Sequence, residues 1–199
     1  MTRSLTHEDL AAFQTRLCDV AEGLFARRGA ENVSMRQIAA ELGVSPMTPY
    51  RYFVGRDDIL VAVRIRGFER FAALLEEAYA ATPGNAAAKG AAAARAYVDF
   101  ALDNANTYRL MFDLHQQDDA SDGPLGRAVR RARATLSVYG DGLIRGGMAK
   151  AEARAMEGLI WSTLHGAVTL ELAGTTPAGS ARETLRLLGR LAAPVAPPT

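Results

Sequence analysis

The sequence predicts an all-α fold, and three observations support this prediction. Alanine, leucine and arginine, which all favour helices, are the commonest of the 199 residues. No convincing run of alternating β-branched residues, the pattern of a β-strand, is present. Glycine, proline and polar segments divide the chain into short helical stretches at first and longer ones later. We therefore expect a small three-helix domain at residues 7–55, joined by a fourth helix to a C-terminal bundle of about five to six helices at residues 56–193.

The N-terminal helices have recognisable ends. The first helix repeats apolar residues at helical spacing and ends at Gly29, a natural C-terminal cap. Its apolar residues are Phe13, Leu17, Val20, Leu24 and Phe25. Ser34 and Gln37, three residues apart, predict a capping box that opens a second helix. After the tight turn LGVS, Ser45 is expected to cap a third helix whose first residue is Pro46.

Longer helices follow, with bounds set by the breakers between them. We expect a fourth helix over about residues 57–80, ended by TPGN, and a fifth through the alanine-rich segment to Leu102. A short helix is expected within NANTYRLMFDL. The last three helices are predicted at about residues 125–144, 150–172 and 181–191. Residues 194–199, with three prolines, are expected to form a disordered tail.

Composition excludes several classes of protein. The net charge of +1 excludes a uniformly basic nucleic-acid protein but allows a local basic face. The single cysteine, Cys18, excludes an intrachain disulfide and a cysteine metal cluster, and we expect no metal or cofactor. The N-terminus lacks the apolar run of a secretion signal, and no stretch approaches the ~20 apolar residues of a membrane span. We therefore expect a cytoplasmic protein with no membrane partner.

The segment SMRQIAAELGVSPMTPYRYF has the layout of a helix-turn-helix. The first of its two helices turns Ile38, Ala39 and Leu42 inward, and the small Ala39 permits close approach of two crossing helices. Gly43 allows the turn, which needs a positive φ. In this motif the helix after the turn enters the major groove of DNA by its N-terminal residues.

The segment from about Leu17 to Val63 resembles the DNA-binding domain of the TetR family of transcriptional regulators. The resemblance rests on a long first helix ending LFARRGAENVSMRQIA, the ELGVS turn, the YRYF end of the third helix, and a basic residue before DDIL. These independent features in one register are specific, whereas a lone helix-turn-helix pattern is weak. The resemblance implies a homodimer that binds a pseudo-palindromic operator, most often as a repressor, and a C-terminal bundle that binds a small effector.

The resemblance also implies which residues contact DNA. Ser34 and the hydroxyls of Tyr50 and Tyr52 match phosphate-binding positions, and Arg36 matches a frequent base-contacting position. Arg56 stands where the family usually has a lysine that anchors the DNA backbone. The full expected set is Ser34, Arg36, Ser45, Met47, Thr48, Tyr50, Arg51, Tyr52 and Arg56. A solvated surface role is the alternative for the tyrosines and Arg36, and the excess of arginine over lysine also fits a GC-rich genome.

Pro49 occupies a position where the family often has leucine. In a helix that begins at Pro46, Pro49 lies in the first turn and removes at most one hydrogen bond, to the Ser45 carbonyl. Pro49 and Phe53 are four residues apart and share a face, which predicts that both point inward. The tilt of the third helix, and therefore the bases that Met47 and Thr48 read, stays open.

The C-terminal region contains no catalytic grouping, glycine-rich phosphate loop or metal-spaced cluster. TYRLMFDL and WSTLHGAVTLELAG resemble segments of one subgroup of TetR-like C-terminal domains. The residues expected to line a cavity for an apolar or aromatic effector are Phe100, Tyr108, Met111, Phe112, His115, Trp161, Leu164, His165 and Val168. For any one of them, ordinary core packing is the alternative.

The last two helices are expected to form the dimer interface, as such helices do in the family. The expected interface residues are Leu159, Ile160, Thr163, Ala167, Leu170, Leu185, Leu188 and Leu191. Two alternatives to an effector-controlled regulator remain open. One is a DNA-binding protein without an effector. The other is a helical enzyme that modifies a small molecule through His165, which is disfavoured because the sequence offers no acid–base partner for this histidine.

Overall fold

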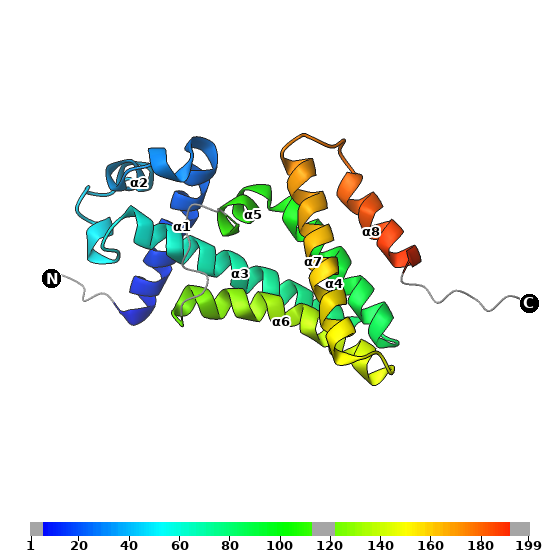
Figure 1. The fold of residues 1–199 in the computed structure, drawn as a ribbon. Coiled ribbons are helices and arrows are strands. Elements are labelled where there is room, and N and C mark those ends of the chain that lie inside the picture. Colours follow the sequence, from blue (N-terminus) through cyan, green and yellow to red (C-terminus); the bar gives the residue numbers. More distant parts are fainter. Residues whose placement is uncertain (1–5, 113–121, 192–199) are drawn as a thin grey trace, which may run out of the picture. The chain divides into compact units, whose positions relative to one another are not determined.

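The computed structural model describes residues 6–112 and 122–191, and these ranges are helical with no strand. The helices are α1 His7–Arg28, α2 Met35–Leu42, α3 Arg56–Ala81, α4 Ala86–Asp103, α5 Ala105–Met111, α6 Pro124–Arg145, α7 Lys150–Leu172 and α8 Ser180–Leu191, with short 3-10 helices η1 Ala30–Asn32 and η2 Pro49–Arg51 (Figure 1). The expected all-α fold class is confirmed. None of these helices has both the length and the apolar character that crossing a lipid bilayer requires.

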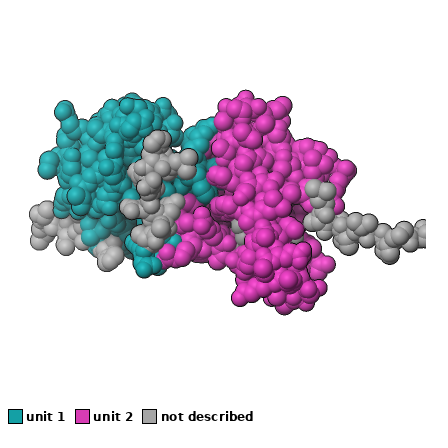
Figure 2. All heavy atoms as spheres, in the orientation of Figure 1, with its two compact units in different colours: residues 1–67, 106–128 teal, residues 68–105, 129–199 magenta. Residues whose placement is uncertain are grey.

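The chain divides into two compact units. The first comprises residues 1–67 and 106–128, and the second comprises residues 68–105 and 129–199 (Figure 2). The divisions fall inside α3 and α6 and after Ala105, the first residue of α5, so α3 and α6 contribute to both units and nearly all of α5 belongs to the first. The domain bounds expected from the sequence, 7–55 and 56–193, remain predictions. The expected tail at 194–199 lies outside the described residues.

The core of the first unit lies between α1, α2, the start of α3 and α5. Its buried members include Leu17, Leu24, Phe25, Ile38, Ile59, Leu60, Val63 and Leu110. Burying one such side chain contributes about 1.5–3 kcal/mol, so this cluster is the main source of the unit's stability. Phe53, expected to point inward, is partly buried against the same cluster.

The ends of α1 and α2 form as the sequence predicts. The Gln37 N–H donates to Ser34 Oγ at 3.3 Å, and the Ser34 N–H donates to Gln37 Oε1 at 2.8 Å, which completes the capping box. Gly29 after α1 and Gly43 after α2 have φ values of 79° and 69°, which residues with a Cβ rarely adopt. A side-chain cap of this kind contributes about 1 kcal/mol, and it fixes the residue at which α2 begins.

The structure corrects one expected element. The sequence predicted a third α-helix capped by Ser45 and beginning at Pro46. Instead, residues 46–47 form a turn that leads into the short 3-10 helix η2. Pro49, the first residue of η2, is buried, which confirms its expected inward position.

A missing hydrogen-bond donor explains this correction. In an α-helix capped at Ser45, the first bond would join the N–H of residue 49 to the Ser45 carbonyl, and Pro49 has no N–H. The Ser45 carbonyl accepts instead from the Thr48 N–H at 2.9 Å, and the Tyr52 N–H donates to the Pro49 carbonyl at 3.0 Å. Both bonds span three residues, the spacing of a 3-10 helix. Pro49 therefore favours 3-10 bonds at the start of this segment, while its own carbonyl also accepts from the Phe53 N–H at 3.1 Å, four residues on.

The short helix α5 is held tightly in the first unit. A Cβ added at Gly67 would lie 2.8 Å from Met111 Cγ, so this glycine lets α5 pack directly against α3. Arg64 is almost fully buried, and its Nη2 donates to the Met111 carbonyl at 3.2 Å, at the C-terminal end of α5. The buried Thr107 hydroxyl donates to the Glu22 carboxylate of α1. These contacts attach α5 to both α1 and α3.

In the second unit, α7 packs against both α4 and α8. Aromatic rings join three of the helices. Phe71 of α3 lies 5.1 Å from Tyr97 and 5.3 Å from Phe100 between ring centroids, and Tyr97 lies 5.5 Å from Trp161 of α7. Such edge-to-face pairs contribute about 0.5–1.5 kcal/mol each beyond the area they bury, so they help to fix α4 against α3 and α7.

Candidate nucleic-acid interface

The N-terminal end of α2 forms the first part of the candidate interface. Ser34, Arg36, Gln37 and Ala40 line a shallow open pocket of about 410 Å³. Arg36 is exposed, and Ser34 caps the helix whose first N–H groups carry partial positive charge. An exposed arginine beside a helix N-terminus suits an anionic partner such as phosphate.

The segment after the turn forms the second part. Met47 is 68% exposed and Tyr50 is 48% exposed, while Arg51 is exposed and Thr48 is half-buried. Ser45 is exposed, and its Oγ accepts from the Met47 N–H at 3.4 Å. Large apolar and aromatic side chains with this much exposure on a folded unit are available to a partner.

The sequence analysis missed Val54, which is 90% exposed. It lies between η2 and α3, where its N–H donates to Asp58 Oδ2 at 3.1 Å and so helps to begin α3. A second apolar residue directly after Phe53, just before GRDD, was the signal that could have drawn attention to this position. Val54 is thus a third exposed large apolar or aromatic residue in the segment 47–54, beside Met47 and Tyr50.

Tyr52 is held by a contact that spacing in the sequence did not reveal. Its ring lies against the ring of Phe13 of α1, with centroids 4.7 Å apart and planes tilted by 31°. Both residues are half-buried. The aromatic body of Tyr52 is therefore fixed by α1, which restricts the positions that its hydroxyl can reach.

Arg56 is occupied by partners within the protein. Its Nη1 donates to the carbonyls of Ala30 at 3.2 Å and Glu31 at 3.1 Å, and its Nε and Nη2 donate to Asp57 Oδ1 at 2.8 and 2.6 Å. One third of its side chain is exposed. The phosphate contact expected for Arg56 remains a prediction, and these internal bonds were not foreseen.

The residues expected around an effector fall in different parts of the fold. In the first unit Tyr108 and Met111 are buried, and the Tyr108 and Phe112 rings lie 4.8 Å apart. In the second unit Phe100, Leu164 and Val168 are buried. His115 lies outside the described residues. The effector cavity as a whole remains a prediction.

Trp161 and His165 form the polar part of this expected set. Their rings are nearly parallel, with an angle of 2° and centroids 6.3 Å apart, and both residues are half-buried on α7. Partial burial lowers the pKa of His165 below its ordinary value, because burial disfavours the charged imidazolium. A neutral, half-buried imidazole beside an indole suits a ligand with an aromatic or apolar body.

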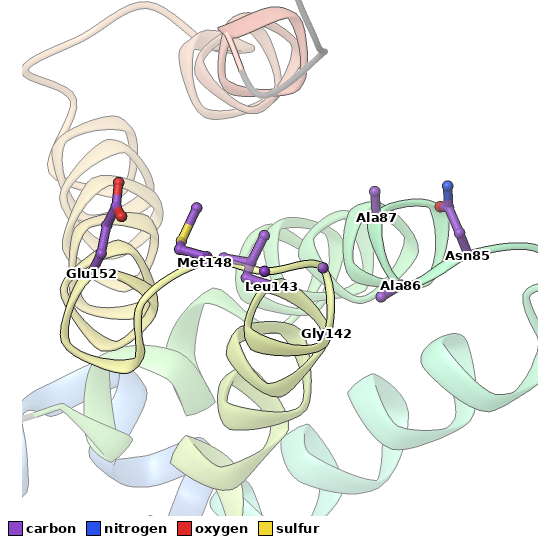
Figure 3. Close-up of a pocket in the computed structure, with 9 residues that line it drawn as sticks. Asn85, Ala86, Ala87, Gly142, Leu143, Met148 and Glu152 are labelled. Carbon is purple, nitrogen blue, oxygen red and sulfur yellow. The ribbon is translucent and has the colours of Figure 1, made fainter.

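A pocket that the sequence analysis did not foresee lies elsewhere in the second unit. Its volume is about 560 Å³, and it lies between the start of α4, the end of α6 and the start of α7 (Figure 3). Its lining residues include Asn85, Ala86, Gly142, Leu143, Met148 and Glu152. A Cβ at Gly142 would lie 2.5 Å from the Ala86 Cβ, so the glycine permits close approach of α4 and α6.

The expected dimer residues include the most exposed leucines of α7. Leu159 is 57% exposed and Leu170 is 49% exposed, and Gly158 and Gly166 have no neighbouring atom within 4 Å of an added Cβ. The other described members of this set are half-buried, namely Ile160, Thr163, Ala167, Leu185 and Leu188. The side chain of Leu191 lies outside the described part of the structure.

Two family models match the chain over most of its length. Residues 17–63 match the model described as bacterial regulatory proteins, tetR family. Residues 91–193, more than half of the chain, match the model described as tetracyclin repressor-like, C-terminal domain. The chain belongs to the TetR family. The helix-turn-helix segment described above is the DNA-binding domain of this family of transcriptional regulators, which is not a family of enzymes.

Individual relatives agree with this assignment. An HTH-type transcriptional regulator of Staphylococcus aureus (strain USA300) is 36% identical over 64 residues, which are 32% of this chain and 35% of that protein. The match therefore spans about a third of the length of this curated relative.

Solved structures share the fold over nearly the whole chain. A protein with unknown function from Rhodococcus sp. RHA1 is 27% identical with a TM-score of 0.77, covering 89% of this chain and 92% of that one. The putative regulatory protein SCO4313 is 25% identical with a TM-score of 0.76, covering 96% and 100%. FadR from Bacillus subtilis, solved with stearoyl-CoA, is 18% identical with a TM-score of 0.69, covering 87% and 96%, and shows the fold alone.

Proposed function

We propose that this TetR-family protein is a cytoplasmic transcriptional repressor. It binds a palindromic DNA operator as a homodimer. The observation that carries the proposal is the exposure of Arg36, Met47 and Tyr50 on α2 and on the segment after the turn. Arginine suits guanine edges and phosphate, and apolar side chains suit thymine methyl groups. We assign the DNA contacts to Ser34, Arg36, Ser45, Met47, Thr48, Tyr50, Arg51 and Tyr52.

The exposed apolar residues of α7 and α8 support a homodimer. Leu159, Leu170 and Leu187 are each 45–57% exposed, which is unfavourable for leucines that water alone covers. The open space beside Gly158 and Gly166 lets a second helix approach closely. A two-fold dimer presents two reading segments to half-sites about 34–36 Å apart, so the operator is an inverted repeat.

An effector of apolar or aromatic character would control this binding through the region of Trp161 and His165. The half-buried, parallel rings of these residues support the assignment. The effector shifts the protein away from DNA only when it binds the released state more tightly than the DNA-bound state. Trp161 is the only tryptophan of the chain, so its fluorescence reports ligands that bind there.

Selection of DNA from a random-sequence library with the purified protein tests the proposal. We expect enrichment of an inverted repeat, bound by two copies of the chain. Arg36→Ala changes the enriched bases, whereas Tyr50→Phe weakens binding to all sequences, because it removes a hydrogen bond to phosphate that carries no sequence information. A library that stays random after repeated selection contradicts the proposed function.

A further inference from the structure

Arg56 connects two elements of the helix-turn-helix unit. It is the first residue of α3, and its Nη1 reaches back to the carbonyls of Ala30 and Glu31 in η1. The Nε and Nη2 groups of Arg56 both donate to Asp57 Oδ1. A guanidinium has five N–H donors in a fixed fork, and these bonds use four of them. The charge of Arg56 is offset by the carboxylate 2.6 Å away.

The 3-10 turn η1, which Arg56 contacts, leads directly into the start of α2. Gly29 ends α1, η1 follows immediately, and Ser34 caps α2 two residues after η1 ends. The turn is tied from α1 as well, since Asn32 Nδ2 donates to the Arg28 carbonyl at 2.9 Å. α2 has only eight residues, so a shift of this turn is carried directly to its N-terminal end.

We propose that Arg56 is a positioning residue that holds the 30–32 turn against the start of α3 and thereby places Ser34 and Arg36 for DNA. This inference rests on the proposed DNA-binding function and assigns Arg56 a role within it. A residue that binds phosphate must turn N–H donors toward the ligand. Arg56 has one N–H left and a neutralised charge, so its main effect is on the placement of α2.

The two roles differ in how Arg56→Ala affects specific and non-specific DNA. Loss of a phosphate contact weakens binding to all sequences about equally and lowers the slope of log K against log salt by about 1. Loss of positioning lowers operator affinity by about tenfold, because a displaced Arg36 loses its base contact. Positioning leaves affinity for random DNA and its salt slope unchanged.

A double-mutant cycle with Arg36 sharpens the test. If Arg56 acts through the placement of Arg36, Arg56→Ala weakens operator binding much less in an Arg36→Ala background than in the natural protein. Independent phosphate and base contacts would give additive losses. Additive losses together with a reduced salt slope would overturn the proposal.

Arg66→Ala is the matched control. Arg66 of α3 also donates to a main-chain carbonyl, that of Thr15 at 3.1 Å, and to a carboxylate, that of Asp19 at 2.6 Å. These bonds tie α3 to α1 rather than to η1, so the loss of Arg66 is expected to lower the urea midpoint and leave the operator-to-random affinity ratio unchanged. An equal fall of this ratio in Arg66→Ala and Arg56→Ala would overturn the positioning role.

Arg56→Lys provides a second test of the positioning role if Arg56→Ala does not fold. It keeps the charge but lacks the planar fork, so we expect a smaller fall of the same affinity ratio with an unchanged slope. Full operator affinity in folded Arg56→Lys would refute the inference. The DNA binding of the natural protein separates the two proposals. If the natural protein shows no preference among DNA sequences, the proposed function fails. If it shows a preference and the Arg56 variants lose affinity for all sequences equally, only the proposed role of Arg56 fails.

Discussion

The ring of Phe13 lies against the ring of Tyr52, with centroids 4.7 Å apart. Phe13 belongs to α1, and Tyr52 follows the short helix η2. A regular α-helix would fix Tyr52 by its own hydrogen bonds, but the segment here has only a short 3-10 helix. The ring contact with α1 therefore takes a larger share in fixing the segment proposed to read DNA.

Phe13→Ala is expected to weaken both folding and DNA binding. The lost ring pair and partial burial lower the free energy of unfolding by about 1–3 kcal/mol, and Tyr52 becomes free to move. Urea unfolding measures the first effect, and the operator dissociation constant, taken where the variant is fully folded, measures the second. Leu10→Ala is the control, because Leu10 lies on the same helix and is 38% exposed. Unchanged operator affinity in Phe13→Ala would contradict the positioning of Tyr52 by α1.

Pro49→Leu is expected to convert the η2 segment toward an α-helix. Leucine supplies the N–H that can reach the Ser45 carbonyl, and its apolar side chain suits the buried position. We expect stronger helical far-UV circular dichroism and a change in the operator bases selected by Met47 and Thr48. Pro46→Ala is the control, because Pro46 lies in the turn before η2 and a new N–H there does not supply the bond that Pro49 lacks. The same spectrum and the same selected operator would show that Pro49 does not set this local conformation.

Local signals in the sequence predicted the helices and their ends, while contacts between distant residues were not predicted. The Ser34 capping box and the positive φ of Gly43 depend on neighbours within a few residues, so spacing alone reveals them. The bonds from Arg56 to Ala30 and Glu31 cross 25 or more residues, and no periodicity reports such a pair. The α-helix expected from Pro46 does not form, and Pro49 lacks the N–H on which the first α-helical bond, to the Ser45 carbonyl, depends.

Leu159→Asp is expected to dissociate the proposed homodimer. The side chain is 57% exposed in the single chain, so the charge is tolerated there. At the centre of an apolar interface, loss of the contact costs about 2 kcal/mol or more, which weakens association by about 30-fold. Analytical ultracentrifugation over a concentration series measures this shift. Val138→Asp on α6, at 40% exposure, is the control and leaves the self-association constant unchanged. A dimer of equal strength in both variants would move the interface away from α7.

Glu171 links the end of α7 to the start of α8, and its titration gives a pH dependence. Its Oε2 accepts from the Ala181 N–H at 2.7 Å, and its Oε1 accepts from the Gly179 N–H at 2.8 Å. These two bonds, that from Ala181 first, lower the pKa of the carboxyl below its ordinary value of 4.5. A carboxyl whose pKa is lower in the folded than in the unfolded protein stabilises the fold at a pH above the unfolded-state pKa. This stabilisation is lost as the pH falls through the folded-state pKa.

Glu171→Gln is therefore expected to lower the free energy of unfolding at pH 7 by about 1 kcal/mol, since hydrogen bonds to a charged acceptor are stronger than those to a neutral one. The difference between the natural protein and the variant shrinks as the pH falls below about 4.5, because the natural carboxyl is then progressively neutralised. Urea unfolding at a series of pH values between 7 and 3 measures this difference. Glu77→Gln, on an exposed position of α3, is the control and gives a difference near zero throughout. A Glu171→Gln difference that stays constant with pH would show that the charge of this carboxylate does not stabilise the start of α8.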